Sequence, residues 1–402
     1  MSSKHKQSNK RSVYDAEPIP QSARGVIDGL LESGDLFRYT AAKDNPSQVT
    51  LLEKEFAAYM GSKYALAVNS ASSAIYLSLL TVGIGTGDQV LIPAWTFAAV
   101  PSAVVNAGAL PILVEVGDDL RIDMADFEAK LNGNIKAVVI SHMRGHTSDM
   151  DMIKALCDAQ DVPLIEDAAH SLGTLWNNRK IGTIGAVGCF SFQSYKMVNG
   201  GEGGILLTDD ADIIAKAVFM SGAYEHNWAK HCHPEVPFEK YQNLLPLFNL
   251  RMNNLSAAVI RPQIELIDGR VAKGLENYDY VAEKLNASPL ISVPPADARE
   301  RRAPDSLQFN LVGFDDAQTR RVMEISTARG NPISIFGMQG DNARVFWNWK
   351  FIGNVPELPI TRAMLKRACD IRLPVGMSRN ELDETVAFIL DCVTEARMLI
   401  AS

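Results

Sequence analysis

Apolar strand candidates alternate with helix candidates from residue 64 to residue 220, and this alternation constrains the fold more than any other feature. The clearest strand candidates are 64–68, 89–92, 110–114, 135–140, 188–192 and 204–208. The helix candidates include 22–33, 51–60, 74–80 and 125–131, and one long helix is expected over about 255–285. Strands that alternate with helices form a mostly parallel sheet with helices on both faces. The sequence therefore predicts an α/β fold.

A lysine stands in the polar turn between two of these strands. Lys196 follows the strand 188–192, and a glycine cluster over 200–204 leads into the next strand. Burial disfavours a charged ammonium group, so a lysine placed between buried strands commonly serves as a neutral amine. Such an amine forms a Schiff base with a carbonyl compound or with pyridoxal phosphate. The alternative is a turn lysine that points into solvent, as most lysines do.

Two carboxylates and a histidine close a second buried run, which begins at Val162. This run contains Glu166, Asp167 and His170. Pyridoxal phosphate requires a carboxylate beside its pyridine nitrogen, and open α/β sheets bind ligands where their strands end. Asp167 meets this requirement, although capping of a following helix is the simpler explanation for an aspartate there.

Three motifs together resemble the DegT/DnrJ/StrS family of pyridoxal-phosphate-dependent sugar aminotransferases. They are EDAAH at 166–170, FSFQSYK at 190–196 and GEGG at 201–204. The resemblance extends from about residue 37 to 258, and more weakly to the C-terminus. It implies fold type I, the aspartate-aminotransferase-like fold. We expect a disordered tail over 1–20, a large cofactor-binding domain over 21–265 and a smaller α+β domain over 266–402.

A small, hydroxyl-rich turn at 69–75 follows the first strand and leads into a helix. A helix N-terminus offers free amides and the positive end of a dipole to a phosphate, although an ordinary serine-capped helix has the same sequence pattern. The resemblance assigns the cofactor phosphate to Ala71 and Ser72, where the family has glycine and threonine. It also assigns Ser191 to this phosphate.

The resemblance implies roles for three further residues. Phe97 is expected to cover the pyridine ring, unless it fills the core as aromatic residues often do. His170 is expected to contact the phenolic oxygen of the cofactor. Asn249, in the segment NLRM, is expected to reach the phosphate bound by a neighbouring subunit. Such a contact implies a homodimer with shared active sites.

The mechanism implied is transamination with Lys196, Asp167 and His170 as the catalytic residues. Lys196 holds the cofactor and then transfers a proton as general base and acid. The expected donor is glutamate or glutamine, and the expected acceptor is a nucleotide-linked keto-sugar or a keto-cyclitol. Alternatives are a lyase, a dehydratase, a racemase, an aminotransferase for a non-sugar ketone, or a non-enzymatic protein that binds the cofactor.

Composition excludes several other classes of protein. The 402 residues carry a formal net charge of −8, which argues against nucleic-acid binding. The five cysteines form no CxxC pair, which favours a reducing, cytoplasmic location: Cys157, Cys189, Cys232, Cys369 and Cys392. No apolar run approaches the roughly 18 residues of a membrane span. No His/Cys/Asp cluster has metal-ligand spacing.

Overall fold

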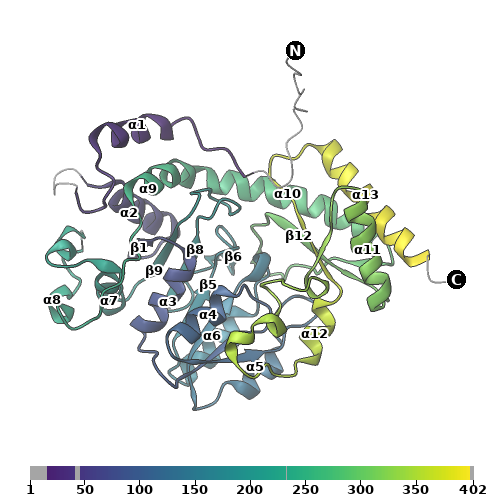
Figure 1. The fold of residues 1–402 in the computed structure, drawn as a ribbon, viewed down its shortest axis with the longest axis horizontal. Helices are drawn as coiled ribbons and strands as arrows, with labels where there is room; N and C mark the ends of the chain where they lie inside the picture. Colours follow the sequence, from purple (N-terminus) through teal and green to yellow (C-terminus); the bar gives the residue numbers. More distant parts are fainter. Residues whose placement is uncertain (1–15, 41–45, 232, 399–402) are drawn as a thin grey trace.

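A seven-stranded sheet forms the centre of the structure, a computed structural model that describes residues 16–40, 46–231 and 233–398 (Figure 1). Its strands are β1 (Tyr64–Val68), β2 (Gln89–Pro93), β3 (Leu110–Val114), β4 (Ile135–Ser141), β5 (Leu164–Asp167), β8 (Val187–Ser191) and β9 (Gly204–Thr208). They lie in the order β1–β9–β8–β5–β4–β2–β3. Every neighbouring pair is parallel except the two that contain β9. The predicted α/β fold with a mostly parallel sheet is confirmed.

Helices cover the sheet, so four of its strands are buried along their whole length. Every residue of β1, β5, β8 and β9 is buried, as expected when both faces of a sheet are covered. The helices that contact these strands include α2 (Gln48–Met60), α3 (Ala71–Thr81) and α7 (Ala211–Gly222). The remaining helices of the large sheet are α1 (Ala23–Ser33), α4 (Ala99–Asn106), α5 (Met124–Lys130), α6 (Met150–Ala159) and α8 (Phe238–Tyr241).

A second, antiparallel sheet has a hydrophobic core of its own. It contains β10 (Ile291–Ser292), β12 (Ser306–Leu311), β14 (Ala368–Arg372) and β13 (Ser334–Ile335), in that order. The helices nearby are α10 (Ile267–Asn286), α11 (Asp316–Ala328), α12 (Pro359–Leu365) and α13 (Arg379–Met398). A three-stranded sheet of β11 (Glu300–Arg301), β6 (Leu175–Trp176) and β7 (Arg179–Lys180) joins the two halves of the chain. The predicted boundary between residues 265 and 266 stays a prediction.

One predicted helix is interrupted in the structure. A single helix over 255–285 was expected, but α9 (Asn254–Ile260) is separated from α10 by the 3-10 helix η3 (Arg261–Leu266). Pro262 lies in the first turn of η3 and has no N–H for the regular α-helical bonding pattern. The expectation of one continuous α-helix is therefore wrong.

The structure describes only a small part of the predicted N-terminal tail. Most of the predicted tail over 1–20, with its lysines, lies outside the described residues. Glu17 is described, and its carbonyl accepts a hydrogen bond of 2.7 Å from the side chain of Asn199.

In the described ranges no helix is long and apolar enough to cross a bilayer, and no cluster of His, Cys, Asp and Glu could hold a metal ion.

Candidate active site

The carboxyl ends of several strands meet at one edge of the sheet and enclose a cavity of about 410 Å³. β5 ends at Asp167, β8 ends at Ser191, and β1 leads into the N-terminus of α3. All the predicted site residues except Asn249 line this cavity: Ala71, Ser72, Phe97, Asp167, His170, Ser191 and Lys196. Topology therefore gathers residues that lie up to 125 positions apart in the sequence.

The N-terminus of α3 forms one wall of the cavity. The helix was expected to begin at Ala74, but it begins at Ala71. The side chain of Ser70 caps it by accepting a hydrogen bond of 3.1 Å from the amide of Ser73. The amides of Ala71 and Ser72 have no acceptor in the described part of the chain. Free amides at a helix N-terminus bind phosphate well, so this turn is suited to an anion.

Glycine at position 204 allows β9 to start directly beneath this turn. A Cβ atom on Gly204 would lie 2.3 Å from the carbonyl carbon of Ser70 and 2.4 Å from the amide nitrogen of Ala71. No side chain fits into that space, so the glycine fixes how closely the sheet approaches the anion-binding turn.

The amine of Lys196 lies inside the cavity beside an imidazole ring. Its Nζ is 2.8 Å from Nε2 and 3.2 Å from Nδ1 of His170. Burial lowers the pKa of Lys196 to about 7, and the positive charges of Arg144 and Arg344 act in the same direction. Burial and the charge of Lys196 also hold the pKa of His170 well below its usual value. Near neutral pH the lysine is therefore available as a neutral amine next to a neutral imidazole.

Asp167 supplies the carboxylate at the end of β5. Its oxygens accept hydrogen bonds from the hydroxyl of Ser141 at 2.8 Å and from the amide of Ala169 at 3.1 Å. Burial raises the pKa of Asp167, although these hydrogen bonds and the charge of Lys196 oppose the shift. A cationic ring nitrogen beside this carboxylate would stabilise its ionised form.

Phe97 keeps an aromatic face in the cavity instead of filling the core. Its side chain is 42% exposed, whereas the nearby Trp95 is 1% exposed and packs edge-on against Phe336. Together, the free amides of α3, the Asp167 carboxylate, the Lys196 amine and the face of Phe97 provide each type of group that pyridoxal phosphate needs. The residues present therefore fit that cofactor.

Asn249 lies outside the cavity, on the surface of the chain. The backbone on both sides of it is fixed, because the amide of Phe248 donates to Met220 and that of Leu250 donates to Ser221. The side chain of Asn249 is exposed. Its expected contact with a neighbouring subunit stays a prediction.

Three arginines line the same cavity and were not identified from the sequence. They are Arg144, Arg344 and Arg372. Arg144 comes three residues after the end of β4, just as His170 comes three residues after the end of β5, so a polar residue shortly after a buried strand was a usable signal. Arg344 and Arg372 come from the C-terminal third of the chain, and no local pattern points to them. His142, by contrast, does not line the cavity: it is buried, and its Nε2 lies 3.1 Å from a carboxylate oxygen of Glu166.

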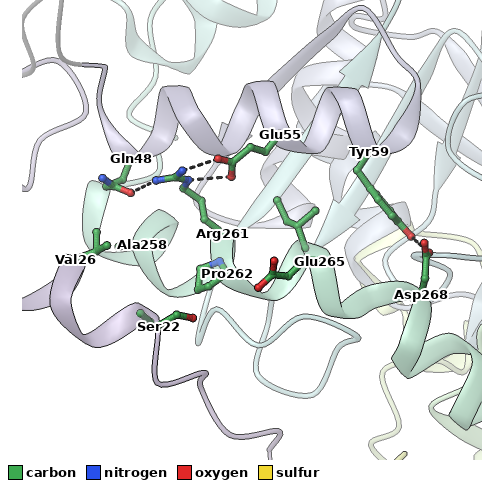
Figure 2. A pocket seen from close by; sticks show the side chains of 12 residues that line it. Ser22, Val26, Gln48, Glu55, Tyr59, Ala258, Arg261, Pro262, Glu265 and Asp268 are labelled. Carbon is green, nitrogen blue, oxygen red and sulfur yellow. Dashed lines mark hydrogen bonds and ion pairs between the residues drawn. The ribbon is translucent and has the colours of Figure 1, made fainter.

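A second hollow, of about 450 Å³, lies elsewhere, between α1, α2 and η3 (Figure 2). Its arginine is fully engaged: Arg261 donates to both carboxylate oxygens of Glu55 and to Gln48. None of the predicted site residues lines this hollow. The cavity around Lys196 is therefore the candidate active site.

Sequence comparison identifies relatives that are named as synthases and as an aminotransferase. GDP-perosamine synthase of Vibrio cholerae is 34% identical over 217 residues, 54% of this chain and 56% of the relative. 3-Amino-5-hydroxybenzoate synthase of Amycolatopsis mediterranei is 28% identical over 330 residues, 81% of this chain and 82% of the relative. A Bacillus subtilis relative named as a pyridoxal phosphate-dependent aminotransferase is 34% identical over 56% of this chain and 57% of its own length. The chain thus matches less than two thirds of the length of two of these three relatives.

Structure comparison and the family match agree with these relatives. An aminotransferase from Psychrobacter cryohalolentis superposes with a TM-score of 0.83 and 24% identity, and the match covers 95% of this chain and all of that one. This likeness shows that the chain has the predicted fold, fold type I. Residues 41–390 match the sequence pattern of one family, which confirms the family that the motifs resembled. The chain belongs to the DegT/DnrJ/EryC1/StrS aminotransferase family.

Proposed function

We propose that this protein is a pyridoxal-phosphate-dependent aminotransferase. The proposal depends on one observation: a single cavity contains a lysine amine with a lowered pKa, a buried carboxylate and the free amides of a helix N-terminus. The relative named as a pyridoxal phosphate-dependent aminotransferase and the family match support both the cofactor and the class of reaction.

The cofactor, when bound, supplies an electron sink that stabilises negative charge at the carbon next to the reacting nitrogen. The residues of the chain bind it and move protons. Lys196 would serve as the general base and acid that moves the proton of the amino donor. Asp167 would face the ring nitrogen and favour its protonated form, and His170 would contact the phenolic oxygen. Ala71, Ser72 and Ser191 would hold the phosphate, and Phe97 would lie against the ring.

The proposed donor is glutamate or glutamine, and the proposed acceptor is a keto-sugar, a keto-cyclitol or a related ring ketone. The family match and the names of the relatives support this class of acceptor. We also propose that the protein works as a homodimer. The exposed Asn249 would then reach the phosphate bound by the partner subunit, as the family resemblance implies.

Substitution of Lys196 tests the proposal. Lys196→Ala should lower the rate by about a thousandfold or more, because proton transfer by a positioned side chain contributes about 10²–10⁴-fold and the attachment point is lost as well. The variant should also lack the visible absorbance of the lysine-bound cofactor. The matched control is Lys273→Ala, which removes an exposed lysine paired with Glu276 on α10. Normal turnover by the Lys196 variant would refute the proposal.

Stoichiometry separates transamination from the other reaction classes. With glutamate but no acceptor, the enzyme should release one equivalent of 2-oxoglutarate per site and stop. Release of ammonia, racemised glutamate or a decarboxylated product would instead indicate a lyase or a racemase.

A further inference from the structure

Two carboxylates stand next to each other at the end of β5, and their surroundings differ. The oxygens of Glu166 accept hydrogen bonds from three backbone amides and lie 3.1 Å from Nε2 of His142. Asp167 lines the cavity and, among the described residues, accepts only from the hydroxyl of Ser141 and the amide of Ala169. Glu166 is therefore saturated by the protein, whereas Asp167 keeps acceptor positions for a ligand.

The sheet itself brings the hydroxyl of Ser141 to this carboxylate. Ser141 and Asp167 are the last residues of β4 and β5, and they lie opposite each other in the parallel pairing of the two strands. The amide of His142 donates to the carbonyl of Asp167 at 3.0 Å and holds the two strand ends together. Paired residues of neighbouring strands direct their side chains to the same face of a sheet. The hydroxyl is therefore placed by a rigid element and not by a loop.

Each oxygen of Asp167 has one protein donor. The hydroxyl of Ser141 lies 2.8 Å from Oδ2, and the amide of Ala169 lies 3.1 Å from Oδ1. In the described part of the chain the Ser141 hydroxyl makes no other side-chain hydrogen bond, so its proton is directed at Asp167. An ionised carboxylate has about four acceptor positions, so room remains for a further N–H donor from the cavity.

The hydrogen bond from Ser141 also counteracts the effect of burial. Asp167 is 5% exposed, and burial raises its pKa. The bond from Ser141 is the largest influence that opposes this shift, ahead of the amide of Ala169 and the charges of Lys196 and His142. Neither Lys196 nor His142 forms an ion pair with Asp167 within the described ranges. A hydrogen bond to the charged form of an acid favours that form, so Ser141 favours an ionised Asp167.

We propose that Ser141 is a positioning residue, whose hydroxyl holds the Asp167 carboxylate ionised and fixed in place, so that the ring nitrogen of the bound cofactor stays protonated. This inference rests on the proposed function. The carboxylate and the ring nitrogen share one proton, and each additional donor to the carboxylate favours the proton on the nitrogen. A protonated ring is the better electron sink. Ser141 would thus act on the chemistry through Asp167 without touching the cofactor.

Binding of two cofactors to the cofactor-free protein tests this role without turnover. Pyridoxal phosphate and its deaza analogue, in which a CH group replaces the ring nitrogen, share the aldehyde, the phosphate and the phenolic oxygen. Ser141→Ala should weaken binding of pyridoxal phosphate about tenfold, because hydrogen bonds to charged groups are strong, and should leave binding of the analogue nearly unchanged. A mere loss of packing would weaken both cofactors equally.

NMR of the bound cofactor, labelled with ¹⁵N in the ring, locates the shared proton directly. The wild-type protein should give the resonance of a protonated ring nitrogen. In Ser141→Ala the resonance should move towards that of an unprotonated pyridine, because the carboxylate has lost a donor. Ser141→Thr keeps the hydroxyl and should restore both the resonance and the preference for pyridoxal phosphate over the analogue.

Ser62→Ala is the matched control. The hydroxyl of Ser62 lies 3.0 Å from a carboxylate oxygen of Asp209, so the substitution also removes a contact between serine and aspartate. Ser62 precedes β1 and Asp209 follows β9, at the edge of the sheet opposite the cavity. This variant should keep the wild-type ratio of the two affinities and the wild-type resonance.

Two results would overturn the proposal: an unchanged ratio of affinities in Ser141→Ala, or an equal loss of affinity for both cofactors. Either result leaves the proposed function intact, because that function is tested by the release of 2-oxoglutarate from glutamate. A wild-type protein that binds the cofactor as described but releases no 2-oxoglutarate would instead contradict the proposed function and leave the role of Ser141 standing.

Discussion

Lys196 shows how burial can prepare a residue for chemistry. An exposed lysine has a pKa near 10.5, whereas burial in this cavity lowers the value to about 7. Because only the neutral amine attacks a carbonyl, capture of pyridoxal phosphate by the cofactor-free protein should accelerate with pH. The neutral fraction increases from about a tenth at pH 6 to about nine tenths at pH 8, and the rate should follow it. Stopped-flow absorbance across this range measures the midpoint.

The same experiment on Arg144→Gln tests the cause of the shift. Arg144 is one of the positive charges that lower the pKa of Lys196, so its removal should move the midpoint to higher pH. A wild-type rate that still increases above pH 9 would show that the amine is not perturbed in this way.

At the scale of elements, the contact between β9 and α3 controls the anion-binding turn. Gly204→Ala would place a methyl group 2.3 Å from the carbonyl carbon of Ser70 and must displace the start of α3. We expect the variant to bind pyridoxal phosphate at least about tenfold more weakly and to lose about 1–3 kcal/mol of stability, the usual cost of overpacking. Fluorescence titration and urea unfolding measure these two quantities.

Gly133→Ala is the control for that substitution. No atom lies within 4 Å of a Cβ built on Gly133, and its φ is not in the left-handed region. Its stability should change by no more than about 0.5 kcal/mol, as for most surface substitutions. If both variants bound the cofactor normally, the close approach of β9 would not matter for the site.

Elements with a strong local signal were predictable from the sequence. The strands 64–68, 110–114 and 204–208 were predicted with the bounds that the structure has, because each is a short, largely apolar run that ends before a polar residue. The start of α3 was missed, because Ser70 and Ser73 are both capable caps and only the fold selects Ser70. The interruption at η3 was also missed, although Pro262 was the signal for it.

At the scale of the whole molecule, the site divides into a part that motifs reveal and a part that they do not. Asp167, His170 and Lys196 lie within thirty residues and form a recognisable pattern. Arg344 and Arg372 reach the same cavity only through tertiary contacts: the amide of Ala98 donates to the carbonyl of Ala343, and Asp370 of β14 pairs with Arg144. Substrate specificity is therefore harder to predict from the sequence than the chemistry.

The proposed homodimer with shared active sites is a property of the whole molecule, and mixing inactive variants tests it. If each site needs Lys196 from one chain and Asn249 from the other, a hybrid of Lys196→Ala and Asn249→Ala chains retains one intact site. Random reassociation makes half of the dimers hybrids, so the mixture should recover about a quarter of the wild-type activity.

Mixing Lys196→Ala with Ser191→Ala is the matched control, because both residues line one cavity of one chain. Each site of that hybrid carries one of the two defects, so activity should not recover. An asparagine that served only its own chain would give the opposite result: no recovery with Asn249→Ala either. The exposed position of Asn249, between two backbone segments that are hydrogen-bonded in place, favours a contact with the partner.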